Sequence, residues 1–230
     1  MNGKRKVLAV FLAVFALGAG NLWGEIIMIG LTGEIDYVSD YEGLLQGRLN
    51  VGDIITGSYT YDSDTLDTHP GPEDIGHYWH YSPPYGIRLT AGGFVFQTDP
   101  DNVEFVIAIG NDYYGDDYLV RSYNNLPIDD DLVIDHIAWH LDDNSGTALS
   151  TDALPTTPPV LEDYPDTWFG LVIEGCKFRP GPHMCDDFYI RANVTSVEII
   201  PEPATVLLFA LGSLAMLRPI FYTCKSEGLR

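Results

Sequence analysis

Positive charge is scarce in this chain. It has 12 Lys and Arg against 33 Asp and Glu, a formal net charge of −21. Half of the cations lie outside residues 25–200, so this central segment holds 31 acidic and 6 basic residues, a formal charge of −25. Surfaces that bind nucleic acid or anionic lipid need a cationic patch to neutralise phosphates. We therefore expect no nucleic-acid partner, and a surface suited to divalent cations, basic partners or simple solubility.

The common catalytic motifs are also missing. There is no Gly-x-Ser-x-Gly elbow, no His-Glu-x-x-His helix and no glycine-rich phosphate loop. A glycoside hydrolase would need only two carboxylates, but in so acidic a segment almost any pair could be proposed. The sequence therefore favours a protein that is not an enzyme, with a glycoside hydrolase on a β-sandwich as the weakest alternative.

No sustained helical period occurs within residues 25–200, whereas strand patterns recur between turns rich in Gly, Pro and Asp. About ten short strands without helical crossovers are typical of sandwiches and barrels. We predict one extracellular domain over residues 25–200, all-β, folded as an antiparallel β-sandwich of jelly-roll type. Residues 62–85 and 151–165 are interpreted as long loops. The predicted strands cover residues 26–38, 54–61, 86–90, 94–98, 103–109, 118–123, 132–141, 168–174 and 188–200.

The amino terminus has the pattern of a secretory signal peptide. Lys4-Arg5-Lys6 precedes an apolar run at residues 7–18, and small residues follow. A membrane anchor is the alternative, but a spanning helix needs about 20 apolar residues. We predict a signal peptide at residues 1–24 that forms a helix outside the fold, and an exported protein.

Two of the three cysteines suit an oxidising compartment. Cys176 and Cys185 flank a loop that contains Pro180-Gly181-Pro182, between two apolar runs. A disulfide that closes this loop is the favoured interpretation, and two free thiols are the alternative. Zinc is disfavoured, because His183 is the one nearby third ligand and a closed site needs four.

Acidic turns supply the candidate metal ligands. Asp142, Asp143 and Asn144 present oxygen atoms at close spacing, and Gly146 permits a tight turn after them. These residues are the first candidates for calcium, although the pattern is not that of an EF-hand. Solvated loops are the alternative, and no other cofactor is expected.

Aromatic residues supply the candidate ligand-binding site. Tyr78, Trp79, Tyr81 and Tyr85 cluster in the predicted long loop, where they could stack on a sugar ring, with Trp139 as a further platform. The nearby histidines do not suggest chelation, since His77 and His80 would point to opposite faces of an extended segment. His136 and His140 would lie about 13 Å apart along one strand.

The carboxyl-terminal region begins with Pro201, Glu202 and Pro203, continues with apolar or small residues at 205–217, and then has Arg218. This apolar run would form about 20 Å of helix, short of a hydrocarbon core of about 30 Å. A marginal, temporary span fits this length better than a permanent anchor. A buried core helix is the alternative.

In this order of elements the chain resembles the PEP-CTERM exported proteins of bacteria, with the sorting signal at residues 201–218. The body resembles one type in that group through residues 51–53, 57–62, 141–148 and 150–155, and no catalytic activity is associated with that type. The family tail usually has an arginine cluster after the helix, whereas here Arg218 stands alone before an atypical tail at 219–230.

The resemblance implies that an exosortase-type membrane protease cuts near Pro201, Glu202 and Pro203 after transient anchoring by the carboxyl-terminal helix. The released domain would reach the cell envelope or an exopolysaccharide matrix of the kind found in biofilms. We therefore predict a non-enzymatic surface or matrix protein, with extracellular polysaccharide as its further partner. The alternative is a carbohydrate-binding module that uses Tyr78, Trp79, Tyr81 and Tyr85.

Mass spectrometry of the secreted protein tests both targeting segments. We expect a mature chain that starts between Gly20 and Glu25 and ends near Pro201, because both flanking segments are removed during export. A secreted form that retains residues beyond Leu217 would contradict the sorting interpretation.

Overall fold

The computed structural model describes residues 25–69, 74–112, 114–129, 132–178 and 187–201. Within these residues the chain forms strands, one short 3-10 helix (η1, Leu161–Asp163) and no α-helix. The prediction of an all-β domain is therefore confirmed. The strands are β1 (Ile26–Asp40), β2 (Ile54–Asp62), β3 (Ile75–His80), β4 (Gly86–Ala91), β5 (Phe94–Gln97), β6 (Phe105–Gly110), β7 (Asp116–Ser122), β8 (Leu132–Asp143), β9 (Gly170–Lys177) and β10 (Phe188–Ile199).

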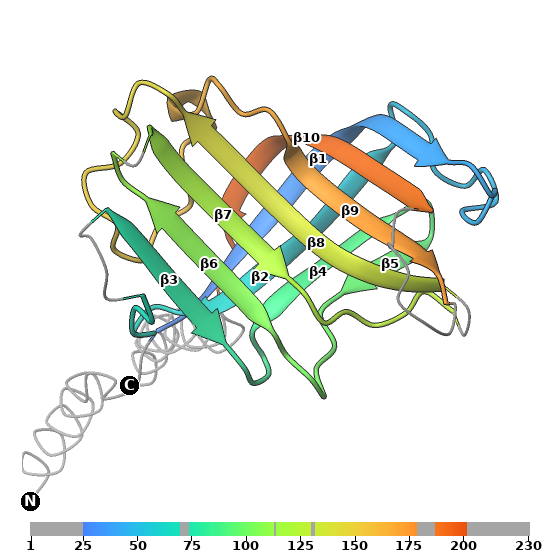
Figure 1. Ribbon diagram of the computed structural model, residues 1–230, viewed down its shortest axis with the longest axis horizontal. Helices are drawn as coiled ribbons and strands as arrows, with labels where there is room; N and C mark the ends of the chain where they lie inside the picture. Colours follow the sequence, from blue (N-terminus) through green and yellow to red (C-terminus); the bar gives the residue numbers. More distant parts are fainter. Residues whose placement is uncertain (1–24, 70–73, 113, 130–131, 179–186, 202–230) are drawn as a thin grey trace, which may run out of the picture.

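All of these strands belong to one antiparallel sheet in the order β3-β6-β7-β8-β9-β10-β1-β2-β4-β5. The sheet curls, so that β3 and β6 to β9 lie in front of β10, β1, β2, β4 and β5 (Figure 1). The pairing of β9 with β10 joins the two halves. The predicted antiparallel arrangement is thus confirmed, but separate sandwich sheets of jelly-roll type are not, because hydrogen bonds run through both halves.

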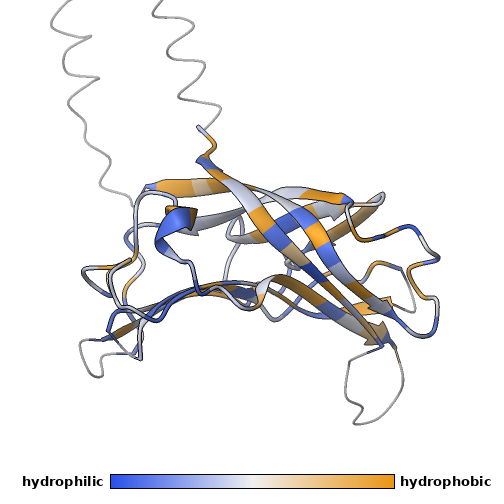
Figure 2. Cartoon of the chain, turned by 90° about the horizontal axis from the view of Figure 1, so that it is seen from above, coloured by the Kyte–Doolittle hydropathy of each residue, from blue (hydrophilic) through white to orange (hydrophobic). Residues whose placement is uncertain are grey.

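Alternation along each strand separates the core from the solvent. In β7 and in the second half of β8, buried and partly exposed residues alternate one by one, as the period of two in an extended chain requires. Figure 2 shows hydrophilic and hydrophobic residues alternating along the strands of both layers. The inward residues of the two halves form one core, whose largest fully buried side chains are Trp139, Tyr59, Tyr61, Tyr118, Phe96, Phe105 and Phe188.

Some strand predictions were wrong in detail. β3 lies inside the segment 62–85, which was interpreted as a loop. The prediction missed this strand because its inward positions are Gly76, Tyr78 and His80 rather than aliphatic residues. In β8 a register shift between Ile134 and His136 turns Val133 away from the core, although strict alternation with Ile137, Trp139 and Leu141 predicts that it lies inside.

The predicted terminal segments cannot be compared with the structure. The described residues do not include 1–24 or 202–230, and the second range contains Glu202, Pro203 and Arg218. Pro201 is the last described residue and is exposed. Among the described residues, no helix has the length and hydrophobicity that crossing a bilayer requires.

A buried pair of tyrosines links the two halves of the sheet. The hydroxyl oxygens of Tyr59 on β2 and Tyr118 on β7 lie 2.8 Å apart, and both side chains are fully buried. Trp139 lies 6.0 Å from the ring of Tyr59 and 5.9 Å from the ring of Tyr118. Burial raises the pKa of both hydroxyls, so each remains protonated and each needs the other as its hydrogen-bond partner.

Substitution of this pair should be non-additive. Tyr118→Phe leaves the hydroxyl of Tyr59 buried without this partner, so we expect the free energy of unfolding to fall by about 1–3 kcal/mol. The double variant Tyr59→Phe/Tyr118→Phe removes both polar groups and should be destabilised less than the single variant. Urea unfolding followed by fluorescence compares the wild type, the single variants Tyr59→Phe and Tyr118→Phe, and the double variant. A double variant that shows the sum of the two single losses would contradict the pairing.

Candidate functional site

Two strand ends bring one histidine and two aspartates, side chains of types that can bind metals, together on the outer face of the front layer. Asp117 on β7 pairs directly with Asp142 on β8, and His140 lies two residues before Asp142. Because residues i and i+2 of a strand share a face, His140 and Asp142 both point outward, beside Asp117. The neighbouring residues Tyr118 and Leu141 point into the core.

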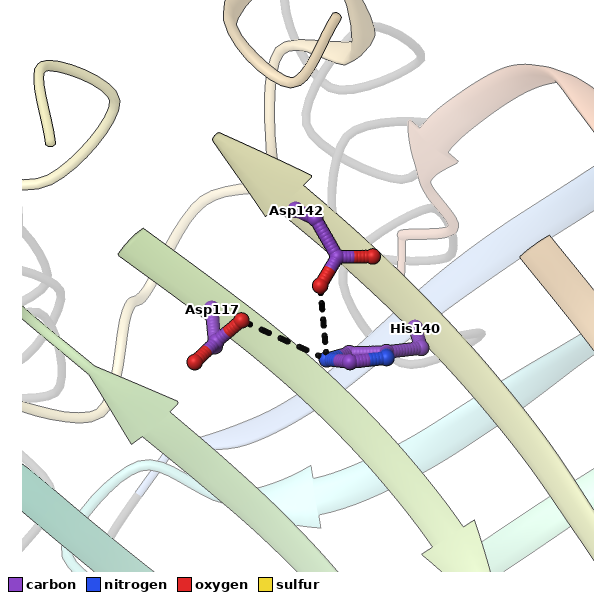
Figure 3. A group of neighbouring side chains, drawn as sticks. All are labelled: Asp117, His140 and Asp142. Atoms are coloured by element: carbon purple, nitrogen blue, oxygen red, sulfur yellow. Dashed lines mark ion pairs between the residues drawn. The ribbon is translucent and has the colours of Figure 1, made fainter. Parts of the chain in front are cut away.

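The imidazole of His140 faces both carboxylates with one ring nitrogen (Figure 3). Its Nε2 atom lies 3.5 Å from Oδ1 of Asp117 and 3.3 Å from Oδ1 of Asp142. Partial burial raises the pKa of Asp117, the positive charge that His140 can carry lowers it, and Asp142 raises it again. The net effect raises the pKa of Asp117, and the cluster holds two acidic side chains in close proximity with one imidazole that faces both.

Asp142 also holds the segment that precedes β9. The hydroxyl Oγ1 of Thr167 accepts from the backbone N–H of Asp142 (3.2 Å), and the N–H of Asp166 donates to the carbonyl oxygen of Asp142 (3.1 Å). The N–H of Trp168 donates to Oδ2 of Asp142 over 3.4 Å, and the ring of Phe169 stacks on the ring of His140 at 6.4 Å. Residues 166–169, here called the aromatic loop, are thus attached to the cluster.

A groove lies on the other side of the aromatic loop. β9 begins at Gly170 and pairs with β10 only as far as Ala192, so the sheet has a step where β10 continues without β9 beside it. Trp168 and Phe169 line this groove of about 490 Å³ together with outward residues of β1 and β10. The polar lining residues include Glu34, Asp36, Arg191, Asn193 and Thr195.

Asp142, Asp143 and Asn144, predicted as calcium ligands, do not converge. Strand alternation turns Asp142 outward and Asp143 inward, where it is 1% exposed. The carboxylate of Asp143 accepts from the backbone N–H groups of Ser145, Thr147 and Ala148, so it organises the turn after β8. The prediction of a shared calcium site is therefore not supported at these residues.

The predicted aromatic platform is divided between the two faces of β3. Tyr78 is 6% exposed and belongs to the core, as does Trp139. Tyr85 is partly buried and packs edge-on against His80. Tyr78 and Trp139 are therefore not available as surface platforms, whereas Tyr85 keeps a partly exposed ring.

Trp79 and Tyr81 do lie on the outer face, where their rings stack at 5.9 Å. Tyr123 stacks on Trp79 at 5.8 Å, and the guanidinium of Arg121 lies 4.6 Å from the ring centre of Tyr123. Trp79 therefore has two ring neighbours within the protein, and Tyr81 is the exposed end of the row.

Cys176 is disulfide-bonded. Its predicted partner, Cys185, lies outside the described residues, so their pairing stays a prediction.

Sequence reasoning missed the cluster and the groove for different reasons. The sequence shows that His140 and Asp142 are two residues apart and share a strand face. Asp117 joins them only through the register of β7 and β8, which the sequence does not show. Trp168 was interpreted as part of a strand, whereas it precedes β9 and is 77% exposed.

Comparisons of the chain with protein-family models, with curated proteins and with solved structures found no match. Function is therefore inferred from the residues and distances described above.

Asp143→Asn should destabilise the protein and weaken its response to acid. Hydrogen bonds from Ser145 and Thr147 hold the pKa of the Asp143 carboxyl well below its usual range. A carboxyl whose pKa is lower in the folded state than in the unfolded state stabilises the fold at a pH above its unfolded pKa of about 3.9. This stability is lost as the pH falls below about 3.9. We expect a lower Tm for the variant at pH 7, and a smaller loss of Tm than the wild type shows between pH 5 and pH 3.

Asp101→Asn, at an exposed turn, is the matched control and should follow the wild type at every pH. Equal acid responses of the wild type and Asp143→Asn would show that this carboxylate does not organise the turn.

Proposed function

We propose that residues 25–200 form an exported, non-enzymatic domain of the cell envelope or extracellular matrix. The signal-peptide pattern at residues 1–24 and the PEP-CTERM-like segment at 201–218 support this proposal, with an exosortase-type protease as the processing partner. The curled sheet would serve as a sandwich-like scaffold, which the single core between its halves supports.

We further propose that this domain binds carbohydrate in the groove beside the aromatic loop. The observation that carries the proposal is Trp168, a large indole that is 77% exposed at the wall of a groove of about 490 Å³. An exposed aromatic face offers apolar area to the C–H face of a sugar ring, while groove-lining polar groups bond its hydroxyls. Asn193 and Thr195 supply such groups from β10.

The charges at the groove favour a neutral polysaccharide over a uronate-rich one. Arg191 is the one cation among the lining residues, and its Nε donates to Oδ1 of Asp36 over 2.9 Å. Glu34 adds a further negative charge, and the whole segment 25–200 carries −25. An acidic polymer would meet like charge at this groove, which slows its approach and weakens its binding.

Glycan binding by the full-length chain in mild detergent tests this site. We expect Trp168→Ala to weaken binding of a neutral polysaccharide at least about tenfold, which corresponds to about 1.4 kcal/mol. Tyr81→Ala removes an exposed aromatic ring outside the groove and should leave binding unchanged.

The reverse result, with loss in Tyr81→Ala only, would move the site to the row of Trp79, Tyr81 and Tyr123. No binding to neutral or uronate glycans by the wild type would remove the carbohydrate proposal and leave the export proposal standing.

A further inference from the structure

The side chains of Asp117, His140 and Asp142 present one imidazole nitrogen and two carboxylate oxygens to a common point, within 4.8 Å of one another. We propose that they bind a divalent first-row transition-metal ion, for which Zn²⁺ is the probe. Mixed nitrogen and oxygen ligands suit such ions, whereas calcium takes six to eight oxygen ligands. This site is separate from the proposed glycan groove and does not rest on it.

The distances in the cluster match those between two ligands of one metal ion. Ligands at about 2.1 Å from zinc in a tetrahedral arrangement lie roughly 3.4 Å apart. Nε2 of His140 lies 3.5 Å from the oxygen of Asp117 and 3.3 Å from that of Asp142. Both distances exceed the about 2.7–2.9 Å of hydrogen bonds between charged groups, and both fit two ligands of one ion.

The surroundings hold the ligands in place. Asp142 directs Oδ1 to the cluster, while its Oδ2 accepts from the N–H of Trp168. The ring of Phe169 lies nearly parallel to the imidazole of His140, with 6.4 Å between the ring centres. Such supporting contacts orient the ligands of metal sites.

A glycine leaves room beside the cluster. Gly110 is the partner of Asp117 on β6. A Cβ atom at Gly110 would lie 3.3 Å from Oδ2 of Asp117, a close contact that would crowd this carboxylate. The absence of a side chain at Gly110 leaves space beside Asp117 for water molecules that complete the coordination of the ion.

A second group, Asp135, His136 and Glu174, provides a matched comparison within the same sheet. There Nδ1 of His136 lies 3.1 Å from Oδ2 of Asp135, its neighbour in the chain, and this contact is a hydrogen bond. Asp135 is more exposed than either aspartate of the first cluster. We therefore expect the second group to act as an ion-pair cluster without a metal.

Isothermal titration of the full-length chain with ZnCl₂, in mild detergent and after dialysis against a chelator, measures the binding. We expect one Zn²⁺ per chain at this site, and a loss of affinity of at least about tenfold in His140→Ala and in Asp142→Asn. His136→Ala should bind as the wild type does. Added Zn²⁺ should raise the Tm of the wild type and of His136→Ala, but not that of His140→Ala.

Replacement by Co²⁺ supplies a readout that does not depend on stability. Visible bands of bound cobalt are expected for the wild type and absent for His140→Ala, with circular dichroism to establish that each variant is folded. Trp168→Ala keeps the backbone N–H that supports Asp142 and should bind zinc normally, whatever it does to glycan binding. No zinc binding by the wild type, unchanged binding by His140→Ala, or equal loss in His136→Ala would each overturn the proposal.

Discussion

Strand alternation in a single curled sheet is the constraint on which the rest of the structure depends. Each strand gives one set of side chains to a core shared by both halves and the other set to the surface. The register that buries Tyr118 and Trp139 is the same register that exposes Asp117 and His140. A slip of one residue would exchange the two sets, so the core and the outer cluster are specified together.

The ends of β7 and β8 show how this constraint assigns different roles to adjacent residues of the same type. Asp116 and Asp143 are partners that point inward, where their carboxylates accept backbone N–H groups and hold the turns. Asp117 and Asp142 are the next pair of partners, and they point outward, toward His140. The inward pair is structural because its carboxylates hold the turns, whereas the outward pair faces a histidine, where the proposed ion would bind.

The sequence identified what depends on local pattern and missed what depends on long-range geometry. The alternation over residues 54–61 and 132–141 predicted β2 and β8 because their inward side chains are mostly large and apolar. The alternation pattern failed to predict β3, where Gly76 and His80 occupy inward positions. Packing against the rest of the sheet, rather than local propensity, makes this segment a strand.

The sites were harder to predict for the same reason. Asp142, Asp143 and Asn144 are consecutive in the chain, which suggested a shared ion, but an extended backbone sends consecutive side chains to opposite faces. Asp117 is absent from that prediction because only the pairing of β7 with β8 places it opposite Asp142. The groove depends on β9 beginning only at Gly170 while β10 continues past Ala192, which no property of either segment alone reveals.

One side chain connects the proposed metal site with the proposed glycan groove. Oδ1 of Asp142 faces His140, while Oδ2 accepts from Trp168, the residue that forms the groove wall. Without an ion, Asp142 lies beside another carboxylate in a protein of high negative charge, and the repulsion between them opposes the rotamer that holds the loop. A divalent cation would remove this repulsion and fix the rotation of the carboxylate. An ion at the cluster would therefore order Trp168 through Asp142 without touching the groove itself.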